Sequence, residues 1–262
     1  MQKFKAFAKV NIFLKITGKR GEYHEILSRF MRVNTLYDEL YFLPKESAWS
    51  EDFTIVGDFS CDYRQNTIYK AYQALLHATN SEALKSHLQR NAIVVEKRIP
   101  AFAGLGGGSS DAATFLWMCN TFLDLGLDTK TLATIGAKVG ADVPFFVYGY
   151  ESANVSGIGE IVEEFVEPAL AFEIFTPALE ISTPKVYSAY RRDFYAPLDA
   201  SLAKSLREKS SLETLKLMSA KEANDLFAPA LQEYEALQAH YKEGYYFSGS
   251  GSSFFKVIED KK

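Results

Sequence analysis

The first strand-like segment is defined by a strict alternation of apolar side chains. Every even position from Phe4 to Ile16 is apolar, whereas the odd positions carry mainly lysine and asparagine. A period of two is typical of a β-strand with one buried face. Lys9 and Asn11 therefore share the opposite face. Phe7 and Phe13 interrupt that face, so it is not a simple solvated surface.

Further elements of the first half follow from capping and turn residues. "TGKRGEYH" reads as a turn, and Asn66 is a good N-cap for a helix. Ser109 or Ser110 can cap a helix through Leu123, and Asp128 can cap one that Gly140 ends. We further expect helices at 67–78 and 82–89 and strands at 29–43, 53–56 and 92–97. A last strand is expected at 142–149, where Pro144 lies near its start.

The second half changes from strand-like to helical patterning. "ANVSGIGEIVEE" predicts a hairpin, 173–176 a strand, and the segments beyond about residue 180 helices. Two β-like runs then flank a Ser-Gly-Ser-Gly-Ser turn. Strands and helices mix without regular βαβ alternation, which favours an α+β fold. We expect a domain boundary near residue 160, which gives domains at 1–160 and 161–262.

Composition narrows the class of partners. The 262 residues are 47% hydrophobic and 24% charged, an ordinary globular balance, and the formal net charge is −4. Scattered basic residues argue against a nucleic-acid partner. No apolar run approaches the roughly 18 residues of a membrane helix, and lysines interrupt any signal-peptide pattern. Cys61 and Cys119 form no Cys-x-x-Cys pair, so we expect a cytoplasmic protein. The oligomeric state stays open.

"GLGGGSSDAA", from Gly104 to Ala113, is the clearest candidate site. Between a strand and a helix start, glycines expose N–H groups beside the positive end of a helix dipole, where a polyphosphate fits. Walker A is excluded because the run has no lysine, and the dinucleotide fingerprint because Ser109 stands at its third glycine. The alternative is a flexible loop or a tight turn.

Three further polar residues attract attention, and each has a structural alternative. Lys9 and Asn11 are either functional or two solvated residues on an edge strand. Asp142, between Gly140 and Pro144, is either a catalytic carboxylate or a turn-forming aspartate. "HEILS" at His24 lacks the second histidine of a zinc-protease helix. We therefore expect no tightly bound metal.

Taken together, these motifs resemble the GHMP small-molecule kinases. "PAFAGLGGGSSDAA" is similar to their phosphate loop. "AFAKVNIFLKITGKRGEYHEILSRF", "GADVPFF" and "SGSGSSFF" resemble the members of that family that act on cytidine diphosphate methylerythritol. The resemblance implies an N-terminal ATP-binding domain like ribosomal protein S5 domain 2, a ferredoxin-like C-terminal domain and an active site in the cleft between them. Glu22 and the bulky Phe102 depart from the family pattern, and little matches between about 185 and 240.

The resemblance also implies a reaction. ATP, with Mg²⁺ carried mainly by its phosphates, would phosphorylate the 2-hydroxyl of the cytidine diphosphate alcohol, a step of non-mevalonate isoprenoid synthesis. Asp142 would accept the hydroxyl proton and Lys9, beside it, would stabilise the alkoxide. The residues implied to bind ATP are Pro100, Ala101, Phe102, Ala103, Gly104, Leu105, Gly106, Gly107, Gly108, Ser109, Ser110, Asn66 and Lys97. Those implied to bind the substrate are Asn11, Tyr23, His24, Thr183 and Tyr187.

Two other functions remain open at this point. The chain could phosphorylate a different alcohol, such as homoserine or mevalonate, although the Tyr23-His24 block argues against this. It could also bind nucleotide without chemistry, although the presence of both Lys9 and Asp142 argues against that. ADP release with and without the cytidine substrate separates the three functions.

Overall fold

The computed structural model describes residues 2–46 and 53–258. The chain divides into two compact units, each assembled from three segments. Unit 1 comprises 1–8, 35–101 and 107–149, and unit 2 comprises 9–34, 102–106 and 150–262. The strands β1 (Phe4–Arg20) and β2 (Tyr23–Pro44) pass through both units. The family domain boundary expected near residue 160 stays a prediction.

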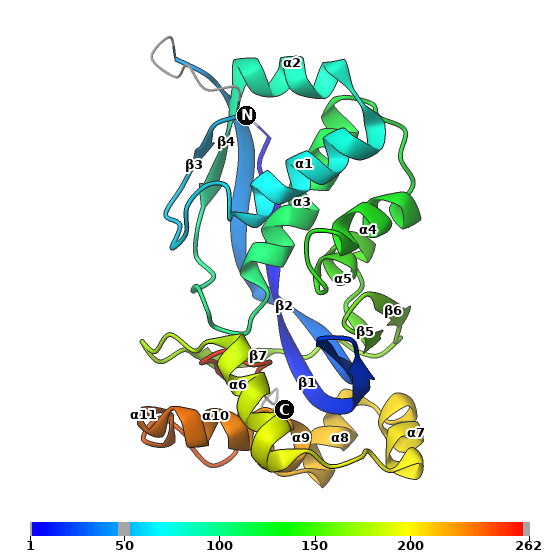
Figure 1. The fold of residues 1–262 in the computed structure, drawn as a ribbon, viewed down its shortest axis with the longest axis vertical. Coiled ribbons are helices and arrows are strands. Elements are labelled where there is room, and N and C mark those ends of the chain that lie inside the picture. Colours follow the sequence, from blue (N-terminus) through cyan, green and yellow to red (C-terminus); the bar gives the residue numbers. More distant parts are fainter. Residues whose placement is uncertain (1, 47–52, 259–262) are drawn as a thin grey trace. The chain divides into compact units, whose positions relative to one another are not determined.

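Unit 1 is a small sheet with helices on one side. The C-terminal half of β2 pairs antiparallel with β4 (Asn91–Glu96), which pairs in parallel with β3 (Ile55–Val56). Figure 1 shows the helices of this unit beside these strands. They are α1 (Thr67–Thr79), α2 (Glu82–Arg90), α3 (Gly107–Phe122), α4 (Thr129–Ala137) and α5 (Val143–Tyr148). Their apolar faces share one core with β2 and β4.

The predicted caps of α1 and α4 are confirmed. Asn66 Oδ1 accepts a hydrogen bond from the Ile68 amide at 2.9 Å, and Asp128 Oδ1 accepts one from the Thr131 amide at 2.7 Å. Each satisfies an N–H group that the first helical turn leaves unpaired, typically a contribution of about 1 kcal/mol. Local sequence therefore determines where these two helices begin.

Three local predictions in unit 1 are wrong. Helix α3 begins at Gly107, so Ser109 and Ser110 lie inside the helix and do not cap it. Helix α4 ends at Ala137, before Gly140. The segment after Asp142 is the helix α5 and not a strand. Pro144 is tolerated in its first turn, where the missing N–H would have had no partner, and Gly149, at φ 70°, ends it.

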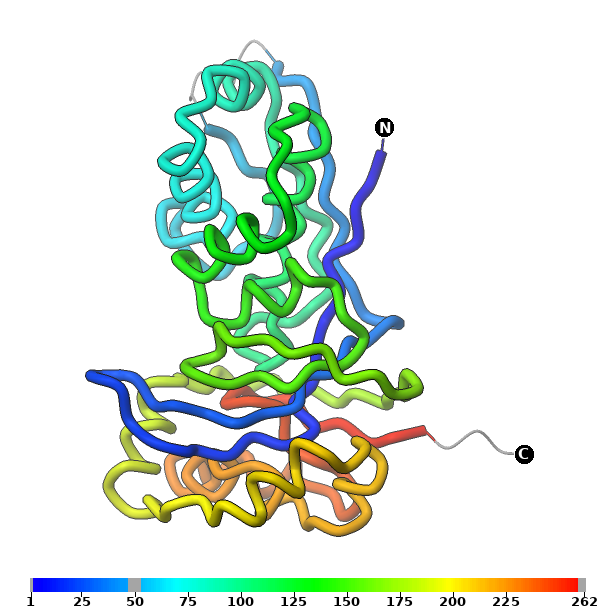
Figure 2. The backbone as a smooth tube through the Cα atoms, turned by 90° about the vertical axis from the view of Figure 1, so that its right-hand side faces the viewer, coloured from blue at the N-terminus to red at the C-terminus, as the bar shows by residue number. Residues whose placement is uncertain are grey.

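Unit 2 contains the other half of β2 and a second sheet. The N-terminal half of β2 pairs with β5 (Ser152–Gly157), which forms the predicted hairpin with β6 (Ile161–Glu164). β9 (Phe254–Val257) lies between β7 (Phe172–Phe175) and β8 (Tyr246–Phe247), which confirms the strands predicted there. Figure 2 shows β1 and β2, in blue, running side by side.

The turn between β1 and β2 is shorter than the sequence indicates. It contains only Gly21 and Glu22, and Gly21 has φ 62°. β1 therefore continues to Arg20, and β2 begins at Tyr23 rather than at Arg29. Pairing with β1, joined from Ile26 onward by pairing with β5, explains the early start of β2, because it satisfies backbone groups that a loop would leave to water.

The helical patterning beyond residue 180 is confirmed. The helices are α6 (Thr183–Ala189), the π-helix η1 (Tyr190–Phe194), α7 (Ala200–Glu208), α8 (Ser211–Leu217), α9 (Ala220–Ala223), α10 (Phe227–Glu233) and α11 (Glu235–Gln238). Several of them pack on a core rich in aromatic side chains. In this core the Phe227 ring stacks on the Phe247 ring, with 4.9 Å between the two ring centroids.

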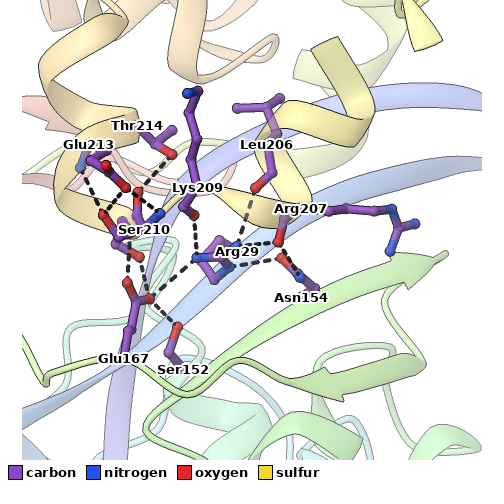
Figure 3. A network of polar contacts seen from close by, with 11 residues as sticks. Arg29, Ser152, Asn154, Glu167, Leu206, Arg207, Lys209, Ser210, Glu213 and Thr214 are labelled. Atoms are coloured by element: carbon purple, nitrogen blue, oxygen red, sulfur yellow. Dashed lines mark hydrogen bonds and ion pairs between the residues drawn. The ribbon is translucent and has the colours of Figure 1, made fainter. Parts of the chain in front are cut away.

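Arg29 links β2 to the end of α7 (Figure 3). Its fully buried guanidinium donates hydrogen bonds to Asn154 Oδ1 at 2.8 Å and to the carbonyls of Leu206 and Arg207 at 3.2 and 3.1 Å. It also forms an ion pair with Glu167 at 3.4 Å. The carboxylate of Glu167 accepts further bonds from the Ser152 and Ser211 hydroxyls. This network holds α7 and α8 on the sheet.

Over the two described stretches, no helix combines the length and the apolar character needed to cross a membrane.

Candidate active site

The glycine-rich run contributes to both units. Pro100, Ala101 and Gly107–Ser110 belong to unit 1, and Phe102–Gly106 belong to unit 2. In unit 1, Gly107 and Gly108 open the 16-residue helix α3. The first turn of a helix has N–H groups without helical partners and carries partial positive charge. The N-terminus of α3 is therefore suited to an anion.

Close packing requires the small residue at Gly107. A Cβ atom there would lie 2.9 Å from a side-chain carbon of Ile99 and 3.5 Å from Lys97 Nζ. At the next position, the Gly108 carbonyl accepts a hydrogen bond from Thr67 Oγ1 at 2.6 Å. Thr67 opens α1, so the start of α1 lies against the start of α3. The absence of side chains thus brings Lys97 close to the start of α3.

The unit 2 part of the run packs on the late Ser-Gly-Ser-Gly-Ser turn. The amides of Ser252 and Ser253 donate to the carbonyls of Phe102 and Ala103 at 3.3 and 3.1 Å. A Cβ atom on Gly251 would lie only 2.0 Å from the amide nitrogen of Gly104, so the two backbones exclude any side chain there. Two glycine-rich segments far apart in the sequence therefore form one structure.

Phe102 has an unusual backbone for a bulky residue. Its φ is 55°, in the left-handed region, which costs about 1–2 kcal/mol for a side chain with a Cβ atom. Its ring is exposed. The hydrogen bond from Ser252 to its carbonyl helps to hold this conformation. The departure from the family pattern at Phe102 thus coincides with local backbone strain.

Lys9 and Asn11 are buried, so the alternative of two solvated residues is wrong. Lys9 is 3% exposed, and its Nζ donates to Asn11 Oδ1 at 2.6 Å and to the Gly104 carbonyl at 2.9 Å. The ammonium also lies 4.7 Å from the centre of the Phe30 ring. Asn11 Nδ2 donates to Ser28 Oγ at 2.9 Å. The lysine is therefore held directly against the glycine-rich run.

A second group in unit 2 surrounds His24. Its ring lies 5.1 Å from that of Tyr187, on α6, and 6.1 Å from that of Tyr190. Among the described residues, His24 Nε2 is buried without a hydrogen-bond partner. Burial, with the charges of Arg191 and Lys19, lowers the pKa of His24, so the imidazole is neutral at pH 7.

The other two residues implied to bind substrate differ in exposure and contacts. The Tyr23 side chain is 65% exposed at the start of β2. The hydroxyls of Thr183 and Ser250 share a hydrogen bond at 2.7 Å, which connects the start of α6 to the Ser-Gly turn. Tyr23 is therefore open to a ligand, whereas Thr183 also has a structural contact.

Asp142 occupies the N-cap position of α5 in unit 1. It is partly buried, and its side chain makes no capping hydrogen bond to α5. The Val143 amide donates to the Gly140 carbonyl at 3.2 Å, which shapes the turn before the helix. This turn fixes the backbone position of Asp142 at the start of α5.

Sequence reasoning missed two carboxylates around Lys97. Lys97 Nζ lies 2.7 Å from Asp111 Oδ2 and 2.5 Å from Asp38 Oδ2, and both aspartates are buried. A signal was present: Asp111 shares a helical face with Phe115 and Met118, both apolar and buried. A carboxylate is rarely buried on such a face unless it has a partner, so the sequence indicated that Asp111 pairs with a cation or a hydrogen-bond donor.

The predicted site residues therefore divide between the two units. Unit 2 contains Lys9, Asn11, Tyr23, His24, 102–106, Thr183 and Tyr187, and unit 1 contains Asn66, Lys97, Pro100, Ala101, 107–110 and Asp142. No cluster of three or more His, Cys, Asp or Glu side chains suited to a metal ion occurs within residues 2–46 and 53–258.

Comparison with known proteins identifies the family. A model of the GHMP kinase N-terminal domain matches residues 66–150. A 4-diphosphocytidyl-2-C-methyl-D-erythritol kinase from Sulfurimonas denitrificans is 63% identical over 262 residues, with 99% of this chain and 98% of the relative covered. One from Campylobacter jejuni subsp. doylei is 39% identical, with 97% and 99% covered.

Solved structures agree with this assignment. A crystal structure of 4-(cytidine 5'-diphospho)-2C-methyl-D-erythritol kinase superposes with a TM-score of 0.72 at 30% identity, covering 98% of this chain and 90% of that one. The Methanococcus jannaschii mevalonate kinase gives 0.63 at 13% identity, with 100% and 92% covered, which shows a shared fold only. The α+β architecture is thus that of the GHMP kinases. On these similarities over almost its whole length, the chain belongs to the 4-diphosphocytidyl-2-C-methyl-D-erythritol kinase family.

Proposed function

We propose that this protein transfers the γ-phosphoryl group of ATP to the 2-hydroxyl of 4-diphosphocytidyl-2-C-methyl-D-erythritol. The observation that carries the proposal is the 63% identity to a kinase of that name over 99% of this chain. The reaction serves non-mevalonate isoprenoid precursor synthesis, and we place it in the cytoplasm. Neighbours at 13% identity, such as mevalonate kinase, support only the fold and favour no other substrate.

The catalytic roles that we propose follow from the needs of phosphoryl transfer. The reaction requires alignment of the hydroxyl and neutralisation of charge more than covalent chemistry. Asp142 accepts the hydroxyl proton, and Lys9 stabilises the developing alkoxide. The burial of Lys9 supports its role, because a cation shielded from water interacts more strongly with developing charge.

ATP is held, in this proposal, by residues 100–110 with Asn66 and Lys97. The helix N-terminus at Gly107 supports this role for the run, because it offers N–H donors and a positive dipole to the phosphates. Mg²⁺ arrives with the nucleotide and is held mostly by phosphate oxygens and water, as this ion prefers.

The cytidine base is bound by the group around His24. A neutral imidazole offers one N–H donor and one acceptor, which complements the mixed edge of cytosine. Tyr23 and Tyr187 supply aromatic surface for stacking, and Asn11 and Thr183 orient the rest of the substrate. The unpaired, buried Nε2 of His24 supports the assignment, because such an atom gains from a ligand partner.

Asp142→Asn tests the reaction directly. Loss of a general base should lower kcat by about 10²–10⁴-fold while the fold and ATP binding persist. ADP release should be measured with and without the cytidine substrate. Asp124→Asn is the matched control, because Asp124 is exposed in the same unit and its φ of 49° suits asparagine equally. Near-normal turnover of Asp142→Asn would refute the base assignment.

Tyr23→Ala tests the identity of the acceptor. Loss of the exposed ring should raise KM for the cytidine substrate about tenfold, a typical effect of losing one stacked base contact, and leave KM for ATP unchanged. A panel with homoserine and mevalonate should show no activity in either protein. An unchanged KM would remove Tyr23 from the binding site, and turnover of another alcohol would overturn the proposed substrate.

A further inference from the structure

We propose that Asp111 is a positioning residue: together with Asp38 it holds the Lys97 ammonium at the N-terminus of α3, and it takes up a proton from solvent when the phosphates of a nucleotide bind there. This inference rests on the proposed ATP site and gives a role there to two carboxylates that the proposed reaction does not otherwise use. The observations that carry it all lie within unit 1.

The two carboxylates anchor the chain before and after the glycines of the glycine-rich run. Asp38 Oδ1, on β2, accepts hydrogen bonds from the amides of Arg98 and Ile99 at 2.5 and 2.8 Å, just before the run. Asp111 lies in α3, after the last glycine of the run. Lys97 bridges the two through their Oδ2 atoms. The three side chains therefore couple the strand-side and helix-side ends of the run.

The Lys97 ammonium is directed to the start of α3. Its Nζ lies 3.5 Å from where a Gly107 Cβ would be, so it sits beside the first helical residue. Burial alone would lower the pKa of Lys97, but Asp111 and Asp38 reverse the direction and raise it, so the ammonium stays charged. A fixed positive charge next to helical N–H donors strengthens an anion site.

The Asp111 carboxylate is incompletely paired. Its Oδ2 accepts the bond from Lys97, whereas its Oδ1 is buried and has no hydrogen-bond partner among the described residues. At Oδ1, an ionised carboxylate has therefore lost hydration that no hydrogen bond from the described residues replaces. Burial, reinforced by the charge of Asp38 and opposed by Lys97, raises the pKa of Asp111 to about 7.

The charges that act on Asp111 are few. They are Lys97, which follows β4, and Asp38, on β2. The helices α1, α4 and α5 pack against α3, and their buried side chains are apolar apart from the Tyr72 hydroxyl. With both aspartates ionised the cluster has a net charge of −1, and with Asp111 protonated it is neutral.

Nucleotide binding should therefore be linked to protonation. Phosphates near Lys97 repel the negative cluster and favour its neutral form, in which Asp111 carries a proton on Oδ1. At pH 8, one unit above its pKa, the unliganded carboxyl is about nine-tenths ionised, so uptake is readily detected. The proton comes from the buffer, and no bond to the nucleotide forms.

Calorimetric titration measures this uptake. The Mg²⁺ complex of a non-hydrolysable ATP analogue is titrated at pH 8 in two buffers with different ionisation enthalpies, without cytidine substrate. Wild type should take up protons, and Asp111→Asn should take up none, because the amide cannot ionise. Asp124→Asn, the exposed control, should match wild type. Equal uptake in wild type and Asp111→Asn, or none in either, would overturn the proposal.

Steady-state kinetics separates positioning from a structural role. The amide oxygen of Asp111→Asn still accepts a bond from Lys97, so KM for ATP should stay within about threefold of wild type, whereas Asp111→Leu should raise it about tenfold, with a smaller change in kcat. Equal KM values for the two variants would contradict positioning. Circular dichroism verifies the fold of the leucine variant. If the leucine variant does not fold, the proton uptake of wild type and Asp111→Asn still tests the proposal.

The two proposals can fail separately. Proton uptake is measured with nucleotide alone, so it does not depend on which alcohol is phosphorylated. A protein that takes up the proton but does not phosphorylate the cytidine substrate would refute the proposed function and leave the role of Asp111 standing. A protein that phosphorylates this substrate with no proton linkage would refute only the role of Asp111.

Discussion

Each unit contains a cation paired with carboxylate, Arg29 in unit 2 and Lys97 in unit 1, and the two clusters around them differ in how completely they are paired. In unit 2, Arg29 binds a carboxylate, an amide oxygen and backbone carbonyls, and Glu167 has serine donors as well (Figure 3). In unit 1, Lys97 binds Asp38 and Asp111, and Asp111 Oδ1 has no partner among the described residues. One cluster is saturated, whereas the other is not.

We interpret this difference as one between a structural network and the cluster for which we propose a function. A fully paired buried network stabilises a single arrangement and gains nothing from a ligand. A buried oxygen without a partner is costly, and proteins retain such atoms chiefly where they serve a function. The choice of cation agrees with this division. The planar guanidinium of Arg29 satisfies several fixed acceptors, whereas the Lys97 ammonium is a point charge suited to a phosphate.

Arg29→Met is the largest predicted perturbation of the comparison. It leaves the buried Glu167 without its cation, and breaking a buried pair in this way costs about 3–5 kcal/mol. Urea denaturation should show the loss, while the activity per folded molecule stays near that of wild type. A loss below about 1 kcal/mol would mean that the saturated network is not the structural anchor inferred here.

Whereas Arg29→Met should destabilise the protein, Asp111→Asn should stabilise it at high pH. The pKa of Asp111 is about 7 in the folded protein, above its ordinary value, so between about pH 4 and 7 the folded state binds more protons than the unfolded state. Stability contributed by this carboxyl is therefore lost as the pH rises.

The size of this effect can be measured by urea denaturation of both proteins at several pH values. Relative to Asp111→Asn, wild type should lose roughly 3 kcal/mol between pH 4.5 and 8. If the free energies of unfolding of the two proteins changed in parallel with pH, the ionised Asp111 carboxylate would not be destabilised by its surroundings. The contrast with the Arg29 network would then disappear.

Arg207→Gln is the smallest predicted effect. Its side chain pairs with Glu163 at 3.1 Å, but both groups are largely exposed, and only its backbone carbonyl takes part in the Arg29 network. Exposed pairs contribute about 0–1 kcal/mol, so the midpoint of unfolding should hardly move. A large shift would mean that side chains around Arg29 are coupled more widely than its direct contacts indicate.

Secondary structure was predictable where local rules agree with packing. The alternation from Phe4 to Ile16 and the caps Asn66 and Asp128 are confirmed because these signals act within a few residues. The segment after Asp142 was predicted wrongly. Its apolar run suits a strand or a buried helix equally well, and only packing against α3 and α4 selects the helix.

The site was predictable as a set of residue types but not as a set of contacts. The glycine-rich run and Lys9 were identified from sequence, yet Lys9 is held by Gly104 and Phe30, which lie far from it along the chain. Its neighbour Asn11 is held in turn by Ser28. Asp38 and Asp111 were missed because each lies on the buried, otherwise apolar face of its strand or helix. Lys97 was identified from the sequence, but its pairing with these two aspartates is formed only when the strand and the helix meet.

The amino-acid sequence by itself determined the family, the glycine-rich run from Gly104 to Ser110 on which the proposed phosphate site rests, and the capped helix starts at Asn66 and Asp128. These properties depend on residue types at short spacing. Tertiary structure decided which polar groups are shielded from water and which partners they have. Hydrogen bonding and burial together set the position of Lys9 and the charges of Lys97 and Asp111, and both depend on residues brought together from distant parts of the chain.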